Sequence, residues 1–421
     1  MSHKQFSRRD VLRFAGAAAV AAPFATGCGA GAPASDAGGA FTVYWNAGHG
    51  YQAYQQVIDE FQKAHGVTVN FQKYQWPDLR TRLLADFASG TVPDVVETQG
   101  AWVQEFAVSG DALSLQDYVA KDGAAMEFPD DWLPATVARN TYQDRLYGAQ
   151  MHYTCSLLLY NKEMVGDTPP STWDELLTAA RELTTGDVYG IALNQDSSYA
   201  WPWLLQNGVR FYDPSSRRTL VDRDAAVEAL QFQADLAHKH KVSPVPVPST
   251  DYAGPQKLLS AKRAAMIITG PWDLKPITES SPDLDLGIAP ALRQKEQATI
   301  SAGASLMVPT KAARPDLSWD FIKRVTALDV ERAATREAGM LMPRKSWAGL
   351  PEVQADERTK AFADGLPYAV DYLQDLGPTG KSGEIADNLF KQLYQSVVVQ
   401  NTPVTEALAV FDAAAEQALA G

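Results

Sequence analysis

The chain has 421 residues, of which 46% are hydrophobic and 21% are charged, and its formal net charge at pH 7 is −13. This composition is typical of a globular protein and excludes an intrinsically disordered chain, and the length is enough for two domains with hydrophobic cores. Because the chain is acidic, neither nucleic acid nor an anionic lipid surface is expected as a partner.

The first 27 residues have the pattern of an export signal. Arg8 and Arg9 form a twin-arginine pair, and an alanine-rich apolar run over residues 15–25 follows them. This run has about half of the roughly 20 apolar residues that a membrane-spanning helix needs. A basic start, a short apolar segment and small residues at its end are typical of a signal peptide that is removed. The twin arginine indicates the export route for folded proteins.

The sequence ATGC, residues 25–28, resembles a bacterial lipobox, with Ala25 in place of the more usual leucine. In a lipobox the cysteine is lipidated and becomes the mature N-terminus, so we expect Cys28 to carry a lipid anchor. Residues 28–40 are rich in Gly, Ala, Ser and Pro and are expected to form a flexible tether. The second of the two cysteines, Cys155, is expected to be a buried structural thiol without a disulfide partner.

Three predicted strands, 41–45, 67–72 and 93–98, alternate with two predicted helices. This order predicts an α/β fold with parallel strands joined by right-handed crossovers. Ligands of such sheets bind beyond the carboxyl ends of the strands. There the chain reads Trp45-Asn46, Tyr74-Gln75-Trp76 and Gln99-Gly100-Ala101-Trp102. Each strand therefore delivers a tryptophan and an amide to the same edge of the predicted sheet.

The second half continues in the same α/β style. Thr172 is a predicted N-cap, with Glu175 completing a capping box at the start of an amphipathic helix. Residues 264–269 are a predicted strand that runs into the sequence GPWD, and the last third is mostly helical. Not every tryptophan is expected at a binding site. Those assigned to core packing are Trp132, Trp173, Trp319 and Trp347.

The sequence contains no G-x-S-x-G, H-E-x-x-H, C-x-x-C or P-loop motif, so no catalytic residue and no cofactor is predicted. The histidines show no ligand spacing, and no metal site is expected from them. They are His3, His49, His65, His152, His238 and His240. Tryptophans and polar side chains at strand ends instead suit a sugar, because aromatic faces cover its C–H surfaces and amides or carboxylates pair its hydroxyls.

Several segments are similar to the extracellular solute-binding proteins of ABC importers, above all to the carbohydrate-binding, maltodextrin-binding-protein-like group. They are PDVVETQGAWVQEFAVSGDAL, LLLYNKEM, PPSTWDELL, AAMIITGPWDL and GMLMPRKS. The resemblance runs from Phe41 to the C-terminus. It implies a periplasmic-binding-protein-like fold of two α/β lobes with hinge crossings and a ligand cleft between them. The implied division is 41–150 and a return at 299–340 for lobe 1, and 151–298 and the C-terminal helices 341–421 for lobe 2.

The resemblance also implies a set of sugar-binding residues. Lobe 1 would contribute Trp45, Asn46 and the turn from Gln99 to Trp102, and the hinge floor Tyr153 and Thr154. Lobe 2 would contribute Tyr199, Trp201, Trp272 and Asp273. Backbone groups of Gly303 and Ala304 and the side chain of Arg344 would complete the site. The chain departs from the family pattern at Ala302, where glycine is common, and in the segment 366–380, and both departures bear on which sugar is preferred.

The implied function is that of a monomeric, lipid-anchored protein on the outer face of the cytoplasmic membrane. It would capture a mono- or oligosaccharide by lobe closure and deliver it to the permease of an ABC importer. Two alternatives stay open from the sequence. A different solute, such as a glycerophosphodiester or a polyamine, would need clustered basic or acidic residues in the cleft. The second alternative, a secreted carbohydrate-active enzyme, would need two facing carboxylates. A purely structural lipoprotein is not favoured, because it would leave the polar and aromatic strand ends unexplained.

Overall fold

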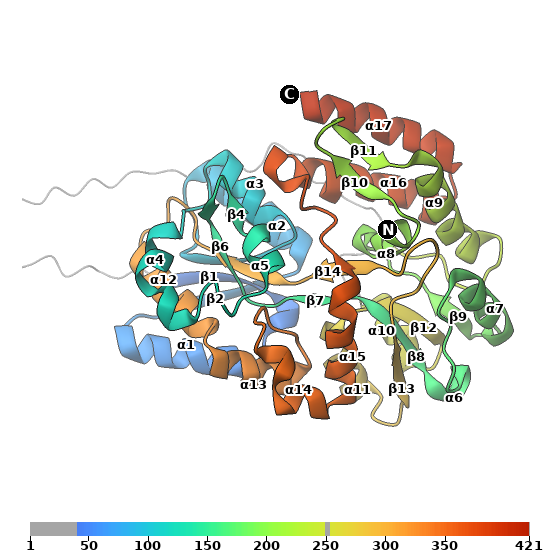
Figure 1. Ribbon diagram of the computed structural model, residues 1–421, viewed down its shortest axis with the longest axis horizontal. Coiled ribbons are helices and arrows are strands. Elements are labelled where there is room, and N and C mark those ends of the chain that lie inside the picture. The colour runs from blue at the N-terminus through green and yellow to red at the C-terminus, as the bar shows by residue number, and fades with distance from the viewer. Residues whose placement is uncertain (1–39, 249–252, 421) are drawn as a thin grey trace, which may run out of the picture. The chain divides into compact units, whose positions relative to one another are not determined.

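The computed structural model describes residues 40–248 and 253–420 (Figure 1). The predicted signal peptide, Cys28 and the predicted tether up to residue 39 lie outside the described residues. Within the described ranges, no helix has both the length and the apolar character needed to cross a membrane.

Lobe 1 is built on a five-stranded sheet. Its strands are β1 (Phe41–Asn46), β2 (Val69–Tyr74), β3 (Val95–Gln99), β6 (Gly148–Gln150) and β15 (Ala304–Met307). Their order in the sheet is β2-β1-β3-β15-β6. β1 is parallel to both β2 and β3, which confirms the predicted parallel arrangement, whereas β15 is antiparallel to β3 and β6.

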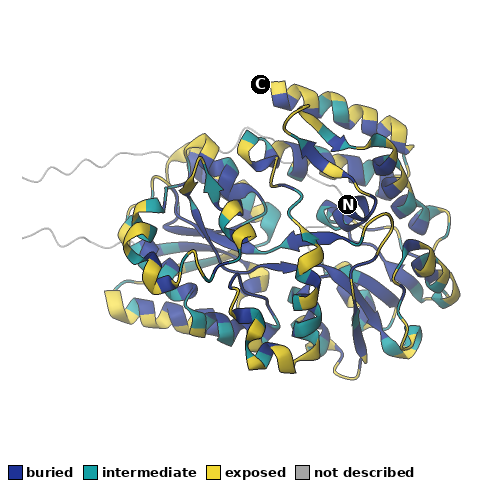
Figure 2. Ribbon diagram, in the orientation of Figure 1, coloured by how far each residue is buried: buried dark blue, intermediate teal, exposed yellow. Residues whose placement is uncertain are grey.

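Helices cover both faces of this sheet because successive side chains of a strand point to opposite sides. Val43 and Trp45 of β1 pack in one cluster with Phe61, whereas Tyr44 packs on the other face with Leu79 and Leu83. Figure 2 shows the strands buried and the outer faces of the helices exposed. The lobe 1 helices are α1 (Gln52–His65), α2 (Trp76–Ser89), α3 (Trp102–Ser109), α4 (Gln116–Asp122), α5 (Pro134–Arg139), α12 (Pro315–Val325) and α13 (Leu328–Ala338). A short hairpin, β4 (Thr141–Tyr142) and β5 (Arg145–Leu146), follows α5.

Lobe 2 is built on a four-stranded sheet. Its strands are β8 (Leu157–Asn161), β9 (Tyr189–Ala192), β12 (Ala264–Thr269) and β13 (Leu286–Ala289), in the order β13-β8-β12-β9. A separate hairpin consists of β10 (Arg210–Asp213) and β11 (Arg218–Val221). The α-helices are α6 (Lys162–Val165), α7 (Trp173–Leu183), α8 (Trp201–Gln206), α9 (Arg223–His238), α10 (Gly254–Ser260), α11 (Leu274–Ser280), α16 (Lys391–Tyr394) and α17 (Val404–Ala420). Two π-helical segments, η8 (Gly383–Phe390) and η9 (Gln395–Val399), flank α16.

Several local predictions for these elements are confirmed. Thr172 and Glu175 form both hydrogen bonds of the capping box at the start of α7. The four tryptophans assigned to packing are each at most 3% exposed. Cys155 is a buried free thiol, and burial raises its pKa to about 12.

Three short strands connect the lobes and define the hinge. They are β7 (Thr154–Cys155), β14 (Thr299–Ala302) and β16 (Ala369–Val370), which pair in the order β16-β14-β7. β7 lies between β6 of lobe 1 and β8 of lobe 2, and β14 lies between β13 of lobe 2 and β15 of lobe 1. β16 precedes the C-terminal helices of lobe 2.

The third crossing differs from the boundary expected at residue 341. Trp347 donates from Nε1 to Thr335 on α13 at 2.9 Å, and Glu352 pairs with Arg332 of the same helix at 2.7 Å. The segment with η5 (Trp347–Gly349) and α14 (Pro351–Ala355) therefore stays with lobe 1. Helix α15 (Glu357–Gly365) then packs against β7 of the hinge and β13 of lobe 2, so the chain leaves lobe 1 after α14 and before β16. A two-residue strand has no periodicity that a sequence could reveal.

Candidate functional site

The carboxyl ends of β1, β2 and β3 meet at one edge of the lobe 1 sheet, as predicted. The residues that follow them form a row of aromatic contacts. The ring of His49 lies 6.0 Å from the ring of Trp76, and Trp76 meets Trp102 edge to face at 5.7 Å. Tyr51 lies 6.0 Å from His49. We call these four residues, His49, Tyr51, Trp76 and Trp102, the lobe 1 wall.

One end of the lobe 1 wall contacts lobe 2 through a charged group. Trp102 Nε1 donates to Asp387 of η8 at 3.1 Å, and Arg80 Nε lies 3.4 Å from the same carboxylate. Arg80 also pairs with Glu105 at 2.6 Å and lies over the Trp102 ring. Burial raises the pKa of Asp387 to about 6, with the negative charges of Glu105 and Asp196 adding to the rise and Arg80 opposing it.

Lobe 2 presents a matching group at the end of β12. Trp272 and Asp273 lie in the turn η4 (Pro271–Asp273), and Trp272 donates from Nε1 to the hydroxyl of Tyr199 at 3.2 Å. Thr269 donates to the Asp273 carboxylate at 2.6 Å. A Cβ on Gly270 would lie 2.2 Å from the Trp272 ring, so only glycine lets the indole lie against the backbone here. Tyr199, Trp272 and Asp273 are named the lobe 2 wall.

The two walls lie close to one another. Glu337 of α13 accepts from the backbone amide of Gln52, next to Tyr51, at 2.7 Å. Burial raises the pKa of Tyr51, and the negative charges of Glu97, Glu337 and Asp273 raise it further. Nearby, Lys275 of α11 pairs with Glu337 of α13 at 2.9 Å. The walls consist of aromatic rings and hydroxyl, carboxylate and imidazole groups, and such a surface suits a ligand with apolar faces and many hydroxyls.

The hinge holds four of the predicted site residues. Thr154 of β7 is fully buried, and its hydroxyl has no hydrogen-bond partner among the residues that the structure describes. Tyr153 lies under the guanidinium of Arg139, 5.6 Å from its ring centroid. Gly303 has a φ of 145°, and a Cβ there would lie 2.0 Å from the carbonyl oxygen of His152. Ala304 donates to that carbonyl and accepts from two backbone amides, so its backbone groups are already paired.

Two predicted site residues point away from this region. Trp45 is 0% exposed in the lobe 1 core, where its Nε1 donates to the carbonyl of His49. Arg344 is 4% exposed and binds Glu331 at 3.0 Å as well as the carbonyls of Met126 and Thr326. Arg344 therefore has a structural role within lobe 1, although its position after a proline resembled that of a sugar-binding arginine.

Three other predicted residues lie beside the walls. Asn46 turns inward and accepts from the amide of Gly48, and its buried Nδ2 has no hydrogen-bond partner in the described part of the chain. Gln99 is partly buried at the end of β3. Trp201 is 1% exposed, and its ring stacks on the ring of Tyr372 at an interplanar angle of 14°.

Some residues of the region were not among the predicted site residues. Trp76 was visible as a strand-end aromatic, whereas His49, Tyr51, Arg80 and Asp387 had no sequence signal, because their partners lie far away in the chain. A cavity of about 390 Å³ lies near the third crossing, lined by Gln104, Ala138, Tyr212, Pro214, Gln374, Asp375, Pro378 and Thr379. None of the predicted site residues lines it, so the candidate site is placed at the two walls.

Comparison with known proteins agrees with this architecture. The maltotriose-binding protein of Pyrococcus abyssi is 22% identical over 337 residues, which is 78% of this chain and 71% of that protein. The maltooligosaccharide ABC transporter solute-binding lipoprotein of Streptococcus pneumoniae is 22% identical over 334 residues, 76% of each chain. An ABC transporter solute-binding protein of Thermotoga lettingae, solved with α-D-tagatose, superimposes with a TM-score of 0.81 at 24% identity, covering 90% of this chain and 99% of that one.

The likeness to the solved structure shows the fold, with two lobes joined by crossings. The model of one protein family matches residues 45–329, which include most of lobe 1, the lobe 2 sheet and the first two crossings. The chain belongs to the bacterial extracellular solute-binding protein family.

Proposed function

We propose that this chain captures a mono- or oligosaccharide between its lobes and delivers it to the permease of an ABC importer. The observation that carries the proposal is the pair of walls, with Trp76 and Trp102 in lobe 1 and Tyr199 and Trp272 in lobe 2. Support also comes from the relatives, whose names give maltotriose and maltooligosaccharides as their ligands.

Binding would act through lobe closure. A sugar that contacts both walls interacts more favourably with the closed arrangement, and it shifts the equilibrium by that difference in affinity. The three short crossings are the segments that would change conformation. The permease would then recognise the closed arrangement. No bond is made or broken in this scheme, so we propose a binding protein and not an enzyme, acting as a monomer and without a cofactor.

We propose the following sugar-binding residues from the two walls and their surroundings. The aromatic faces would come from Trp76, Trp102, Tyr199 and Trp272. The polar partners would be Asn46, Gln99, Asp273 and Asp387. Tyr153, Thr154 and Gly303 would form the floor at the hinge. Trp45 and Arg344 are left out because their side chains are fully engaged elsewhere.

The alternatives have less support from the charges at the walls. A phosphate-containing solute would need unpaired basic groups, but Arg344 is buried in lobe 1 and Arg80 is paired with Glu105. A carbohydrate-active enzyme should turn over a chromogenic glycoside. We expect no turnover.

Calorimetric titration with a panel of mono- and malto-oligosaccharides tests the proposal. The chain from residue 28, with Cys28→Ser to keep it in solution, should bind at least one sugar of the panel. Trp272→Ala should weaken that binding by about 1 kcal/mol or more, because an aromatic platform is lost. Trp272→Phe keeps the ring and should retain most of the affinity. No binding to any sugar, or equal affinity for all three chains, would overturn the proposal.

The anchoring at Cys28 is a separate proposal, since the extracellular character of the family leaves the means of attachment open. Fractionation of cells that express the full chain tests it. The protein should sediment with membranes, and Cys28→Ala should move it to the soluble fraction or the medium. A Cys28→Ala variant that stays in the membrane fraction would contradict lipidation.

A further inference from the structure

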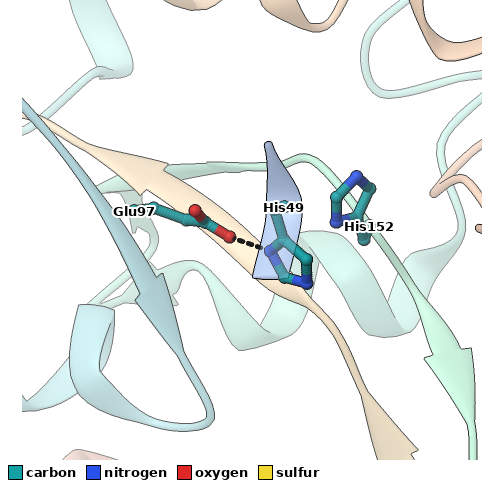
Figure 3. A group of neighbouring side chains, drawn as sticks. All are labelled: His49, Glu97 and His152. Carbon is teal, nitrogen blue, oxygen red and sulfur yellow. Dashed lines mark hydrogen bonds and ion pairs between the residues drawn. The ribbon is translucent and has the colours of Figure 1, made fainter. Parts of the chain in front are cut away.

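Three side chains that bind metals in other proteins meet beside the lobe 1 wall (Figure 3). His49 ends the turn η1 (Ala47–His49), Glu97 lies in the middle of β3, and His152 lies between β6 and β7. One ligand atom from each lies within 4.8 Å of the other two. Their exposed fractions are 8% for His49 and 0% for both Glu97 and His152.

Glu97 is a buried carboxylate whose partners are hydrogen-bond donors. One oxygen accepts from the backbone amide of Asn46 at 2.7 Å, and the other contacts Nδ1 of His49. Among the described residues, His49 is the only side chain that forms an ion pair with Glu97, and it is positively charged only when protonated. Burying a carboxylate is costly unless a positive charge or a metal compensates it.

His152 has a free ligand atom. Its Nε2 lies 2.5 Å from the hydroxyl of Tyr54, whereas its Nδ1 is buried and has no hydrogen-bond partner within residues 40–248 and 253–420. When Nε2 carries the proton and donates to Tyr54, the lone pair of Nδ1 is left unpaired. This is the usual arrangement of a metal-binding histidine, whose second nitrogen donates to a neighbouring group that fixes the ring.

The rings of His49 and His152 are close and perpendicular, with centroids 4.8 Å apart and an interplanar angle of 88°. Figure 3 shows the ring of His49 between Glu97 and His152. Two imidazoles and one carboxylate are a donor set that suits Zn²⁺ and related divalent transition metals. With bonds of about 2.1 Å, the ligand atoms of a tetrahedral ion lie about 3.4 Å apart. Small side-chain rotations would bring the three atoms to that distance.

We propose that His49, Glu97 and His152 bind one divalent transition-metal ion of the Zn²⁺ class. Three protein ligands leave a coordination position open for water or for a ligand oxygen. The neighbouring Tyr51 and Trp76 place this position beside the candidate sugar site. The spacing of the histidines in the sequence shows no metal motif, since the fold alone brings residues 49, 97 and 152 together.

Metal binding is tested without any sugar present. The untagged chain from residue 28, carrying Cys28→Ser, is treated with a chelator, dialysed and titrated with Zn²⁺, and the bound metal is counted by elemental analysis. We expect one equivalent. Co²⁺ in its place should give the visible absorption of a four- or five-coordinate ion.

Variants locate the site. His49→Ala and Glu97→Gln should each weaken Zn²⁺ binding by about 100-fold or more, and Tyr54→Phe by about tenfold, because Tyr54 orients a ligand. His65→Ala and His240→Ala are matched controls, since these histidines contact Asp320 and Arg181 at the surface. They should bind as the parent chain does. Circular dichroism at the titration temperature confirms that each variant is folded, and His49→Gln replaces His49→Ala if the latter is not.

Two outcomes overturn the proposal. The first is that the parent chain retains no Zn²⁺ after dialysis. The second is that binding is lost in His65→Ala or His240→Ala but kept in His49→Ala. Because metal binding is measured without any sugar, failure of sugar binding leaves this result unaffected.

Discussion

Arg139 of α5 donates from Nε to the carboxylate of Asp371 at 2.7 Å, and this pair joins lobe 1 to the third crossing. The same guanidinium donates to Ser301 of β14 at 2.6 Å and lies over Tyr153 beside β7. One side chain therefore touches all three crossings. The side chains of Arg139 and Asp371 are 4% and 13% exposed, so the pair is largely shielded from water.

Removing Arg139 should destabilise the protein strongly. Arg139→Met leaves the shielded Asp371 carboxylate without its cation, and we expect the free energy of unfolding to fall by about 3–5 kcal/mol. Adding Asp371→Leu should recover much of this loss. Urea denaturation followed by tryptophan fluorescence measures both. Arg82→Met is the control, because Arg82 is 53% exposed and its pair with Asp86 should contribute much less to stability than the shielded pair. A similar effect of both single substitutions would contradict this account.

Gly303→Ala should disrupt the close backbone contact between the first two crossings. The new Cβ would lie 2.0 Å from the His152 carbonyl at a backbone φ of 145°, so either β7 or β14 has to move. We expect a loss of several kcal/mol in the free energy of unfolding, which is in the range of severe backbone clashes (about 4 kcal/mol or more). Ala302→Gly, one residue earlier, restores the glycine pair common in the family and should cost about 1 kcal/mol or less. Equal stability of the two variants would count against the close approach at Gly303.

Gly270→Ala should affect ligand affinity more than stability. A methyl group there displaces the Trp272 ring from its position beside Tyr199, because the Cβ would lie 2.2 Å from the ring. Sugar affinity measured by calorimetry should therefore fall. The loss should be at least as large as the small loss expected for Trp272→Phe. Gly349→Ala serves as the control, since its Cβ would meet nothing within 4 Å. Unchanged affinity in Gly270→Ala would show that Trp272 is not held in place in this way.

Asp387 should give the protein a distinctive pH dependence. Its pKa is raised from 3.8 to about 6 in the folded state, so the unfolded chain releases this proton first as the pH rises. The stability due to this group is therefore full below pH 3.8 and is lost as the pH rises towards 6. Because 34% of the side chain is exposed, we expect a loss of about 1 kcal/mol.

Asp387→Asn removes this proton equilibrium. The difference in unfolding free energy between the parent chain and Asp387→Asn, measured at about pH 4 and about pH 7.5, should shift by that amount in favour of the variant. If the difference in unfolding free energy is the same at both pH values, the Asp387 carboxyl has the same pKa in the folded and the unfolded state.

Much of the fold follows from local sequence signals. Residues 264–269 form β12 as predicted because five apolar residues in a row, Ala264 to Ile268, lie between Arg263 and Thr269. Helix α7 begins after Thr172 because the Thr172 side chain caps it. The edge of the lobe 1 sheet was also predictable, since parallel strands bring their carboxyl ends together. The tryptophans that end or follow these strands could be assigned to that edge. The sequence did not predict whether each indole ring faces the core or the candidate site.

The remaining features depend on contacts between distant parts of the chain. Trp45 follows the alternation of β1 into the core, and Arg344 is neutralised by Glu331, which no pattern connects to it. Asp387 contacts Trp102 from a C-terminal π-helical segment. His152 follows β6 and lies near His49 because β15 pairs with both β6 and β3. The hinge strands contain two to four residues each, which is too short for a periodic signal.

The position of β15 in the sheet determines when the fold of lobe 1 can be completed during synthesis. β15 separates β3 from β6, yet it leaves the ribosome only after every strand of lobe 2 has been synthesised. Until then the place between β3 and β6 is empty, and both strands present unpaired edges, which are liable to aggregate. The sheet of lobe 1 is therefore completed only after the sheet strands of lobe 2 have been synthesised. A chain of this kind benefits from folding before export, and the twin-arginine signal predicted from residues 8 and 9 would serve that route.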